Sequence, residues 1–273
     1  MTLIDRNWDA VAASTVGRAH QRARRGSQDA WAVRLERDFA VAVVCDGCSG
    51  GEASEVGAGL GARFVAADLP RRLKQGTTVD DVVDLTLAAL IEMLGNTARA
   101  CSVDDDVAHF ISSCLLFTVQ AAVIGPERYV VFGVGDGLVR VNGVAIPVPA
   151  PDDGAPDCPA YRLVEGLRDH ARLRVHARGS TSSLRSLVVA SDGALELGAV
   201  TSTALPNGEL FGGLALFERD ERFVSNPSLA SKRVASLGNA APEDDCSVVV
   251  LRRRPPVIGT ALGELDGGGM SCT

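Results

Sequence analysis

The sequence predicts an α+β protein in which helices cover antiparallel β-sheet, and three observations carry this prediction. Residues 113–141 run through strand, Pro-containing turn, strand, Gly-Asp-Gly and strand, the pattern of an antiparallel meander. Residues 52–94 carry apolar side chains at helical spacing, which predicts two helices that cover one face of a sheet. Several short apolar runs end in Asp-Gly, as buried strands do when they leave the core.

Composition indicates one globular domain. The chain has 273 residues, of which 46% are hydrophobic and 22% charged, enough to bury a core. No sharp change in composition divides it, so we expect a single domain over residues 1–251. The remainder, 252–273, contains RRRPP and GGG and is expected to be a flexible C-terminal tail.

Net charge and apolar segments exclude some classes of function. A net charge of −7 argues against a nucleic-acid-coating protein, because neutralising phosphates requires clustered Lys and Arg. No signal-peptide pattern and no run of 18 apolar residues occurs, so we expect a cytoplasmic protein without a membrane partner. Seven cysteines are expected to be reduced thiols, and the CxxC at Cys45 and Cys48 has no second CxxC to complete a zinc site.

The first third of the chain predicts a strand, a basic segment and a hairpin. Residues 8–16 form the first strand, and residues 31–35 and 39–44 form the hairpin. The basic segment between them carries His20 and four arginines, and it ends just before Asp29. Guanidinium groups match phosphate oxygens bidentately, so this segment is either a phosphate contact or a solvated loop; its arginines are Arg18, Arg22, Arg24 and Arg25.

The middle of the chain predicts helices and then strands. One helix covers 52–73, with Glu52 and Glu55 in its first turn, and a second begins at Val79 after Thr77 or Thr78 as its cap. Strands follow at 113–124, 128–134 and 138–141. The Pro-rich stretch 147–159 is a surface loop or a flap over the substrate, and 163–177 fits either strand or helix.

The last third predicts two more strands and helical segments between them. Strands are expected at 186–190 and 246–251, and 194–240 is expected to be helix and loop, with a final helix at 229–237.

Carboxylates recur at the ends of these strands. Each alone is explained as a turn residue, since Asp and Gly favour turns. Together they offer hard oxygen ligands that converge on one rim of a sheet sandwich and suit Mg²⁺ or Mn²⁺, including a pair of ions as in phosphatases. The residues are Asp29, Asp46, Asp136, Asp192 and Asp245.

The order of the motifs resembles the metal-dependent, type 2C (PPM) family of serine/threonine protein phosphatases, in a divergent bacterial branch. The resemblance covers about residues 10–251, and it implies a four-layer αββα sandwich of two mainly antiparallel sheets, with a metal site at one edge. The motifs are SQDA at 27–30, VVCDGCSGG at 43–51, GVGDG at 133–137, VVASDGALE at 188–196 and EDDCSVVVL at 243–251.

The resemblance also implies roles for individual residues. Asp46 would bridge two metals, with the Gly47 carbonyl on the second and with Asp192 and Asp245 on the first. Asp29 would hold a metal-bound water, and Asp136 matches the carboxylate that helps bind a third, weaker ion in many members. Arg24 is expected to contact phosphate, with the competitors Arg25, Arg22 and His20.

The implied reaction is attack of a metal-bridging hydroxide on phosphoserine or phosphothreonine, with His20 as a candidate general acid. The implied partner is a phosphoprotein, and the enzyme would oppose a serine/threonine kinase. Gln28 replaces a common Glu, GDG replaces GDSR, and Cys246 replaces an Asn, so substrate contacts differ from the family pattern. A catalytically weak regulatory module, a phosphodiesterase and a small-molecule phosphatase are the alternatives.

Overall fold

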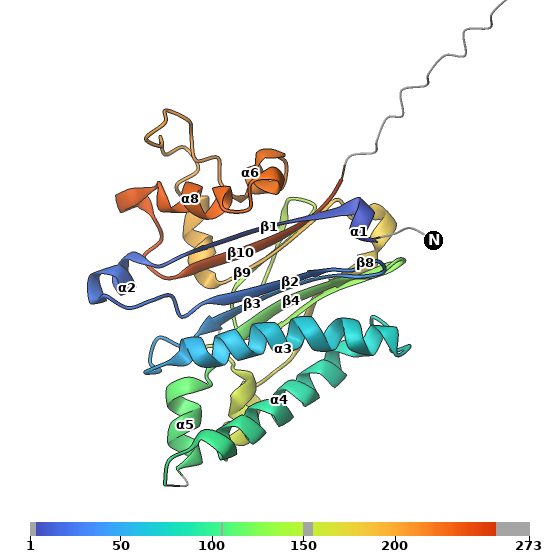
Figure 1. Ribbon diagram of the computed structural model, residues 1–273, viewed down its shortest axis with the longest axis vertical. Helices are drawn as coiled ribbons and strands as arrows, with labels where there is room; N and C mark the ends of the chain where they lie inside the picture. The colour runs from blue at the N-terminus through green and yellow to red at the C-terminus, as the bar shows by residue number, and fades with distance from the viewer. Residues whose placement is uncertain (1–3, 105, 150–154, 255–273) are drawn as a thin grey trace, which may run out of the picture.

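The computed structural model describes residues 4–104, 106–149 and 155–254, and it has four layers (Figure 1). Two five-stranded antiparallel sheets face each other in the middle, as predicted. The first sheet has the order β1-β10-β9-β6-β7, with bounds Trp8–Thr15, Cys246–Arg253, Ser186–Ala190, Leu138–Val141 and Val144–Ile146. The second has the order β2-β3-β4-β5-β8, with bounds Ala30–Leu35, Ala40–Gly47, Phe117–Ile124, Arg128–Val134 and Arg174–Ser180.

Helices cover the outer face of each sheet (Figure 1). The second sheet carries α3 (Ser54–Lys74), α4 (Val82–Cys101) and α5 (Val107–Cys114). The first sheet carries α6 (Leu214–Phe217), α7 (Arg222–Ser225) and α8 (Leu229–Ala235). Short helices α1 (Ile4–Asn7) and α2 (Arg18–Ala23) flank β1, and 3₁₀ turns occur at Pro159–Leu163, Arg168–His170, Thr181–Ser183, Asp192–Gly198 and Gly238–Ala240.

Alternating side chains on the strands build three separate cores. Successive residues of a strand point to opposite faces of the sheet. A strand that lies between two layers therefore buries apolar side chains on both of its faces. On β3, Ala40, Ala42 and Val44 pack between the two sheets, whereas Val41, Val43 and Cys45 pack against α3 and α4. The central strands therefore read as unbroken apolar runs.

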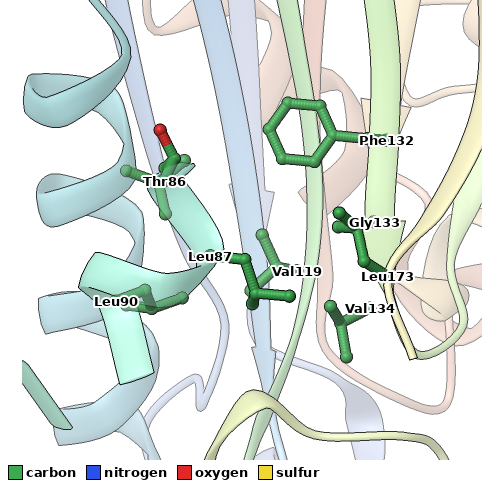
Figure 2. Close-up of a pocket in the computed structure, with 9 residues that line it drawn as sticks. Thr86, Leu87, Leu90, Val119, Phe132, Gly133, Val134 and Leu173 are labelled. Carbon is green, nitrogen blue, oxygen red and sulfur yellow. The ribbon is translucent and has the colours of Figure 1, made fainter. Parts of the chain in front are cut away.

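A small apolar cavity of about 10 Å³ lies where α4 meets the second sheet (Figure 2). Its lining includes Leu87 and Leu90 from α4 and Val119 and Phe132 from the sheet. The one hydroxyl on its wall, Thr86 Oγ1, donates a hydrogen bond to Asp68. Figure 2 shows hydrocarbon side chains facing one another, so this cavity is a packing gap rather than a polar binding site.

One predicted strand boundary is wrong, and the structure decides one segment that the sequence left open. The strand expected from Ser113 begins only at Phe117, because residues 107–114 form α5. The α5 N-terminus is capped by Asp106, whose side chain accepts the His109 N–H at 2.9 Å. The segment 163–177, for which strand and helix were both open, contains 3₁₀ turns and the first half of β8.

The expected meander is also interrupted. Strand β4 does pair with β5, but β6 joins the other sheet beside β9, where Leu138 is opposite Ala190. The Gly135-Asp136-Gly137 segment therefore carries the chain from one sheet to the other instead of closing a hairpin. Both glycines have positive φ, 87° and 136°, which disfavours any residue with a side chain.

Strand β10 continues to Arg253, two residues past the predicted end of the domain, and residues 255–273 of the expected tail lie outside the described residues. Residues 150–154 of the predicted loop 147–159 also lie outside them. Among the described helices, none combines the length and the apolarity needed to cross a membrane.

Candidate active site

Strands from both sheets end at one edge of the sandwich and open into a cavity of about 190 Å³. Asp46 is the penultimate residue of β3, Asp192 follows β9, and Asp244 precedes β10. Asp136 lies on the crossing between β5 and β6. The cavity is lined by Asp46, Gly47, Cys48, Ser49, Thr118, Asp136, Pro156, Cys158, Asp192 and Asp244.

In two Asp-Gly pairs of the site, the glycine lets neighbouring chain segments pack closely against its Cα. Asp46 and Gly47 lie within β3, so they form no turn. A Cβ on Gly47 would lie 2.7 Å from Ser54 Oγ and 2.8 Å from the Gln28 carbonyl. A Cβ on Gly193 would collide with the backbone of Asp245. Glycine is required here because any side chain would push the acidic residues apart.

Negative charge accumulates at this edge. Burial, followed by the charges of Asp29 and Asp192, raises the pKa of Asp46 well above its ordinary value. Burial is also the main cause that raises the pKa values of Asp136 and Asp244. Each of these carboxylates makes ionisation of its neighbours less favourable. A bound cation would offset this repulsion and stabilise the ionised forms.

The buried oxygen atoms fit a metal site. Among the described residues, Asp29 Oδ1 and Asp192 Oδ1 are buried without a hydrogen-bond partner. Such orphaned carboxylate oxygens are costly unless a cation or water satisfies them. The donor set consists of hard oxygens, which suits Mg²⁺ or Mn²⁺.

Asp29 lies behind the cavity wall, where Ser191 holds it. Ser191 Oγ donates to Asp29 Oδ2 at 2.7 Å and accepts the Ser247 N–H at 2.9 Å. Burial raises the pKa of Asp29 to about 7, partly offset by the Ser191 hydrogen bond. Ser191 is therefore a site residue that sequence reasoning missed, because a serine beside Asp192 carries no distinctive signal.

Asp245 faces the protein interior rather than the cavity. Its Oδ1 accepts the Gly17 N–H at 2.7 Å, and its Oδ2 accepts the Gln28 N–H at 2.6 Å and contacts His20 Nδ1 at 2.8 Å. Its neighbour Asp244 lines the cavity. Both residues precede β10, so strand alternation does not set their directions; the backbone hydrogen bonds from Gly17 and Gln28 fix that of Asp245. The sequence of the pair carries no signal that tells the two carboxylates apart.

The predicted phosphate-binding arginines lie outside the described lining of the cavity. Arg24 is exposed at the end of α2 in a left-handed conformation, with φ 56°. Arg25 donates to the carbonyls of Gly51 and Glu52, at 3.2 and 3.0 Å. Arg18 and Arg22 both pair with Glu243. Among the described residues, neither Arg24 nor Arg25 has an ion-pair partner, and of the four arginines only the Arg24 side chain makes neither an ion pair nor a hydrogen bond.

The other polar and sulfur groups divide between site and core. Gln120 donates to the Asp136 carbonyl at 2.7 Å and so fixes the crossing between the sheets. Cys45 packs in the core against α3, whereas Cys48 lines the cavity, so the two sulfurs of the CxxC lie in different environments. Cys158 and Pro156 also line the cavity, and they belong to the loop predicted at 147–159.

The sequence pattern described as protein phosphatase 2C matches residues 16–212, which is more than half of the chain. The chain belongs to the protein phosphatase 2C family. It is a protein phosphatase of a metal-dependent family, as the sequence motifs indicated. No curated protein sequence matches it.

Solved structures show the same fold at low sequence identity. The serine/threonine phosphatase Stp1 from Staphylococcus aureus is 14% identical, with a TM-score of 0.55 over 90% of this chain and 95% of that one. PppA, described as a regulatory component of T6SS in Pseudomonas aeruginosa, is 15% identical, with a TM-score of 0.54 over 90% and 98%. A protein described as a bacterial serine phosphatase is 14% identical, with a TM-score of 0.54 over 90% and 97%.

Proposed function

We propose that this phosphatase removes phosphate from phosphoserine and phosphothreonine in proteins, with Mg²⁺ or Mn²⁺ as its cofactor, and that it opposes a serine/threonine kinase. The observation that carries the proposal is the convergence of Asp46, Asp192 and Asp244 from both sheets on one cavity with unsatisfied carboxylate oxygens. Protein-bound metals would lower the pKa of water and neutralise charge on the phosphoryl group.

The roles of the chain's own groups follow from their positions. Asp46 and Gly47 line the cavity at the end of β3, where Asp46 would be shared by both ions and the Gly47 carbonyl would hold the second. Asp192 and Asp244 would complete the first ion, so we assign to Asp244 the role that the sequence pattern suggested for Asp245. Asp136, across the cavity, would help hold a third ion.

Two further groups would act around the metals. Asp29 would accept a hydrogen bond from water at the back of the site. Arg24 is the candidate for phosphate contact, because it is exposed and its side chain makes neither an ion pair nor a hydrogen bond with a described residue.

The test is hydrolysis of phosphoserine and phosphothreonine peptides with and without Mn²⁺. We expect Asp46→Asn, Asp192→Asn and Asp244→Asn each to lower kcat/KM by at least about 100-fold, since even the partners of metal ligands affect activity by about 10–100-fold. Asp84→Asn on the exposed face of α4 is the matched control and should retain full activity.

Activity that persists in excess chelator, or in all three variants, would overturn the two-metal proposal. Metal binding without turnover of any phosphopeptide would favour a regulatory module. Turnover of p-nitrophenyl phosphate alone would favour a phosphatase of small molecules. Full activity in Asp244→Asn together with a loss in Asp245→Asn would return the ligand role to Asp245.

A further inference from the structure

We propose that His20 is a nitrogen ligand of the metal site, acting beside Asp244, and that Asp245 is the positioning residue that aims it. The inference rests on the proposed metal-dependent function and adds a ligand of a different chemical class. It makes the site a mixed nitrogen and oxygen site rather than an all-oxygen one.

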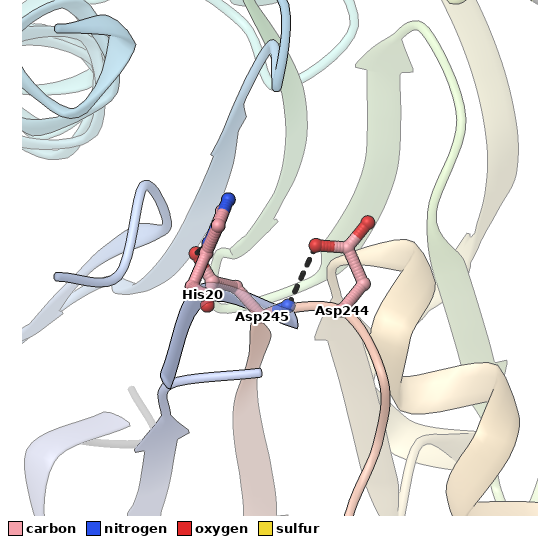
Figure 3. Close-up of side chains that lie close together, drawn as sticks. All are labelled: His20, Asp244 and Asp245. Carbon is pink, nitrogen blue, oxygen red and sulfur yellow. Dashed lines mark hydrogen bonds and ion pairs between the residues drawn. The ribbon is translucent and has the colours of Figure 1, made fainter. Parts of the chain in front are cut away.

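The geometry places the three groups within coordination range of one point. A ring nitrogen of His20 and one carboxylate oxygen each from Asp244 and Asp245 all lie within 4.8 Å of one another. Figure 3 shows the His20 ring and the Asp244 carboxylate projecting to the same side. Asp244 Oδ1 accepts the Asp245 N–H at 2.7 Å, which fixes its direction and leaves Oδ2 for another partner.

Asp245 sets the tautomer of the histidine. Its carboxylate already accepts the backbone N–H groups of Gly17 and Gln28, which can only donate. The contact of 2.8 Å to His20 Nδ1 therefore has Nδ1–H as the donor. In the neutral ring, Nε2 then carries the lone pair, as in the carboxylate–histidine–metal arrangement of many metal sites.

His20 is 9% exposed, and no hydrogen bond from the described residues reaches its Nε2. Nε2 is not one of the buried atoms without a partner in the described residues, so it is open to water or to a ligand. His20, like His109, His170 and His176, is not among the residues that line the cavity, so it would reach an ion from beside Asp244, which does line it.

Gly17 keeps the histidine in register with the acidic pair. A Cβ at this position would lie 2.6 Å from the Asp244 carbonyl oxygen and from the Asp245 nitrogen. The backbone before α2 can therefore lie directly against the residues that precede β10. With Asp245 holding both ends of the segment 17–28, the position of His20 is determined by contacts independent of any ion.

An imidazole ligand changes which cation the site prefers. Imidazole suits Fe²⁺ and Zn²⁺, and Mn²⁺ accepts it more readily than Mg²⁺, which strongly prefers oxygen. We therefore expect a larger ratio of Mn²⁺ to Mg²⁺ affinity than a carboxylate site alone would give.

The test is pulsed electron paramagnetic resonance of the Mn²⁺-loaded protein. The wild-type protein should show nitrogen modulation from a directly bound imidazole, and the pattern should change when histidine is labelled with ¹⁵N. This readout needs no variant and does not depend on activity. His20→Gln should abolish the modulation, whereas His109→Gln on the exposed face of α5 should leave it unchanged.

Titration calorimetry supplies the second readout. His20→Gln and Asp245→Asn should each weaken Mn²⁺ binding by about 10–100-fold and Mg²⁺ binding by less. Mn²⁺ bound without histidine nitrogen modulation would overturn this inference and leave the proposed function intact, with His20 then assigned to the phosphoryl group. Absence of both Mn²⁺ binding and phosphatase activity would overturn the proposed function as well. Equal losses for the two cations would also contradict a nitrogen ligand.

Discussion

At the scale of single residues, Asp29 illustrates how the site stores unfavourable charge. Its pKa rises to about 7, mainly through burial, with the charge of Asp245 adding to the effect. An unfolded Asp ionises near pH 4, so between about pH 4 and pH 7 the unfolded chain has lost a proton that the folded chain retains. Stability contributed by the protonated group is therefore lost as the pH rises through that window.

We expect Asp29→Asn to gain stability relative to the metal-free wild-type protein as the pH is raised from about 4.5 to about 7.5, because asparagine does not ionise. The upper bound is about 4 kcal/mol, from about three pKa units at about 1.4 kcal/mol each. Urea unfolding in chelator at both pH values measures the difference. A difference that does not depend on pH would contradict this account of Asp29.

Residue types at strand ends predicted much of the site. Asp46, Asp136 and Asp192 line the cavity because an acidic residue that follows a buried strand has to emerge at the sheet edge. The pair Asp244 and Asp245 could not be resolved in the same way. Both precede β10, and hydrogen bonds from segments distant in the sequence fix the direction of Asp245.

At the scale of elements, Asp68 joins the two long helices that cover the second sheet. It lies on α3, is 3% exposed, and accepts a hydrogen bond from Thr86 of α4 at 3.1 Å. Arg71 and Arg72, one turn further along α3, pair with the same carboxylate. Burial raises the pKa of Asp68, but the hydrogen bonds from Arg72, Arg71 and Thr86 outweigh it, and the net pKa is lowered.

We expect Asp68→Asn to destabilise the protein by about 1–3 kcal/mol near neutral pH, because it removes charge-assisted hydrogen bonds from a buried position. A lowered pKa stabilises above the unfolded value near 4, and this contribution disappears as the pH falls through the folded value. The difference between variant and wild type should therefore shrink below about pH 4. Denaturant unfolding measures it, and Asp84→Asn on the outer face of α4 is the control.

Periodicity predicted the long elements and failed where pairing is decided by distant segments. The long helices have a helical apolar spacing, and the central strands are unbroken apolar runs. Strand β6 alternates, but nothing in its own residues indicates that it leaves β5 to pair with β9. Helix α5 has apolar residues at Val107, Phe110, Ile111 and Cys114, a helical spacing that the adjacent apolar run of β4 obscured.

At the scale of the whole molecule, the site joins two sheets that otherwise meet through apolar contacts. Asp46 comes from the second sheet, whereas Asp192 and Asp244 come from segments at the ends of strands in the first. The core between the sheets consists mainly of small and branched apolar side chains, such as Ala42, Val189 and Val249, together with Trp8 and Tyr129. A cation held by both sheets would therefore act as a clamp on the edge of the sandwich.

Metal binding should for this reason stabilise the whole domain rather than one loop. At a free Mn²⁺ concentration about 100 times the dissociation constant, linkage gives about 2.7 kcal/mol of stabilisation. For a chain of this size, that corresponds to a rise in Tm of about 5–10 °C. Calorimetry with Mn²⁺ or with chelator measures this rise in Tm.

Asp46→Asn and Asp192→Asn should each remove most of the shift in Tm. The two residues belong to different sheets, and the loss of either carboxylate leaves the cation bound to one sheet only. Asp84→Asn should retain the shift. If Asp192→Asn retains the full shift, the ion is held by the second sheet alone, and the two-sheet site proposed above is wrong.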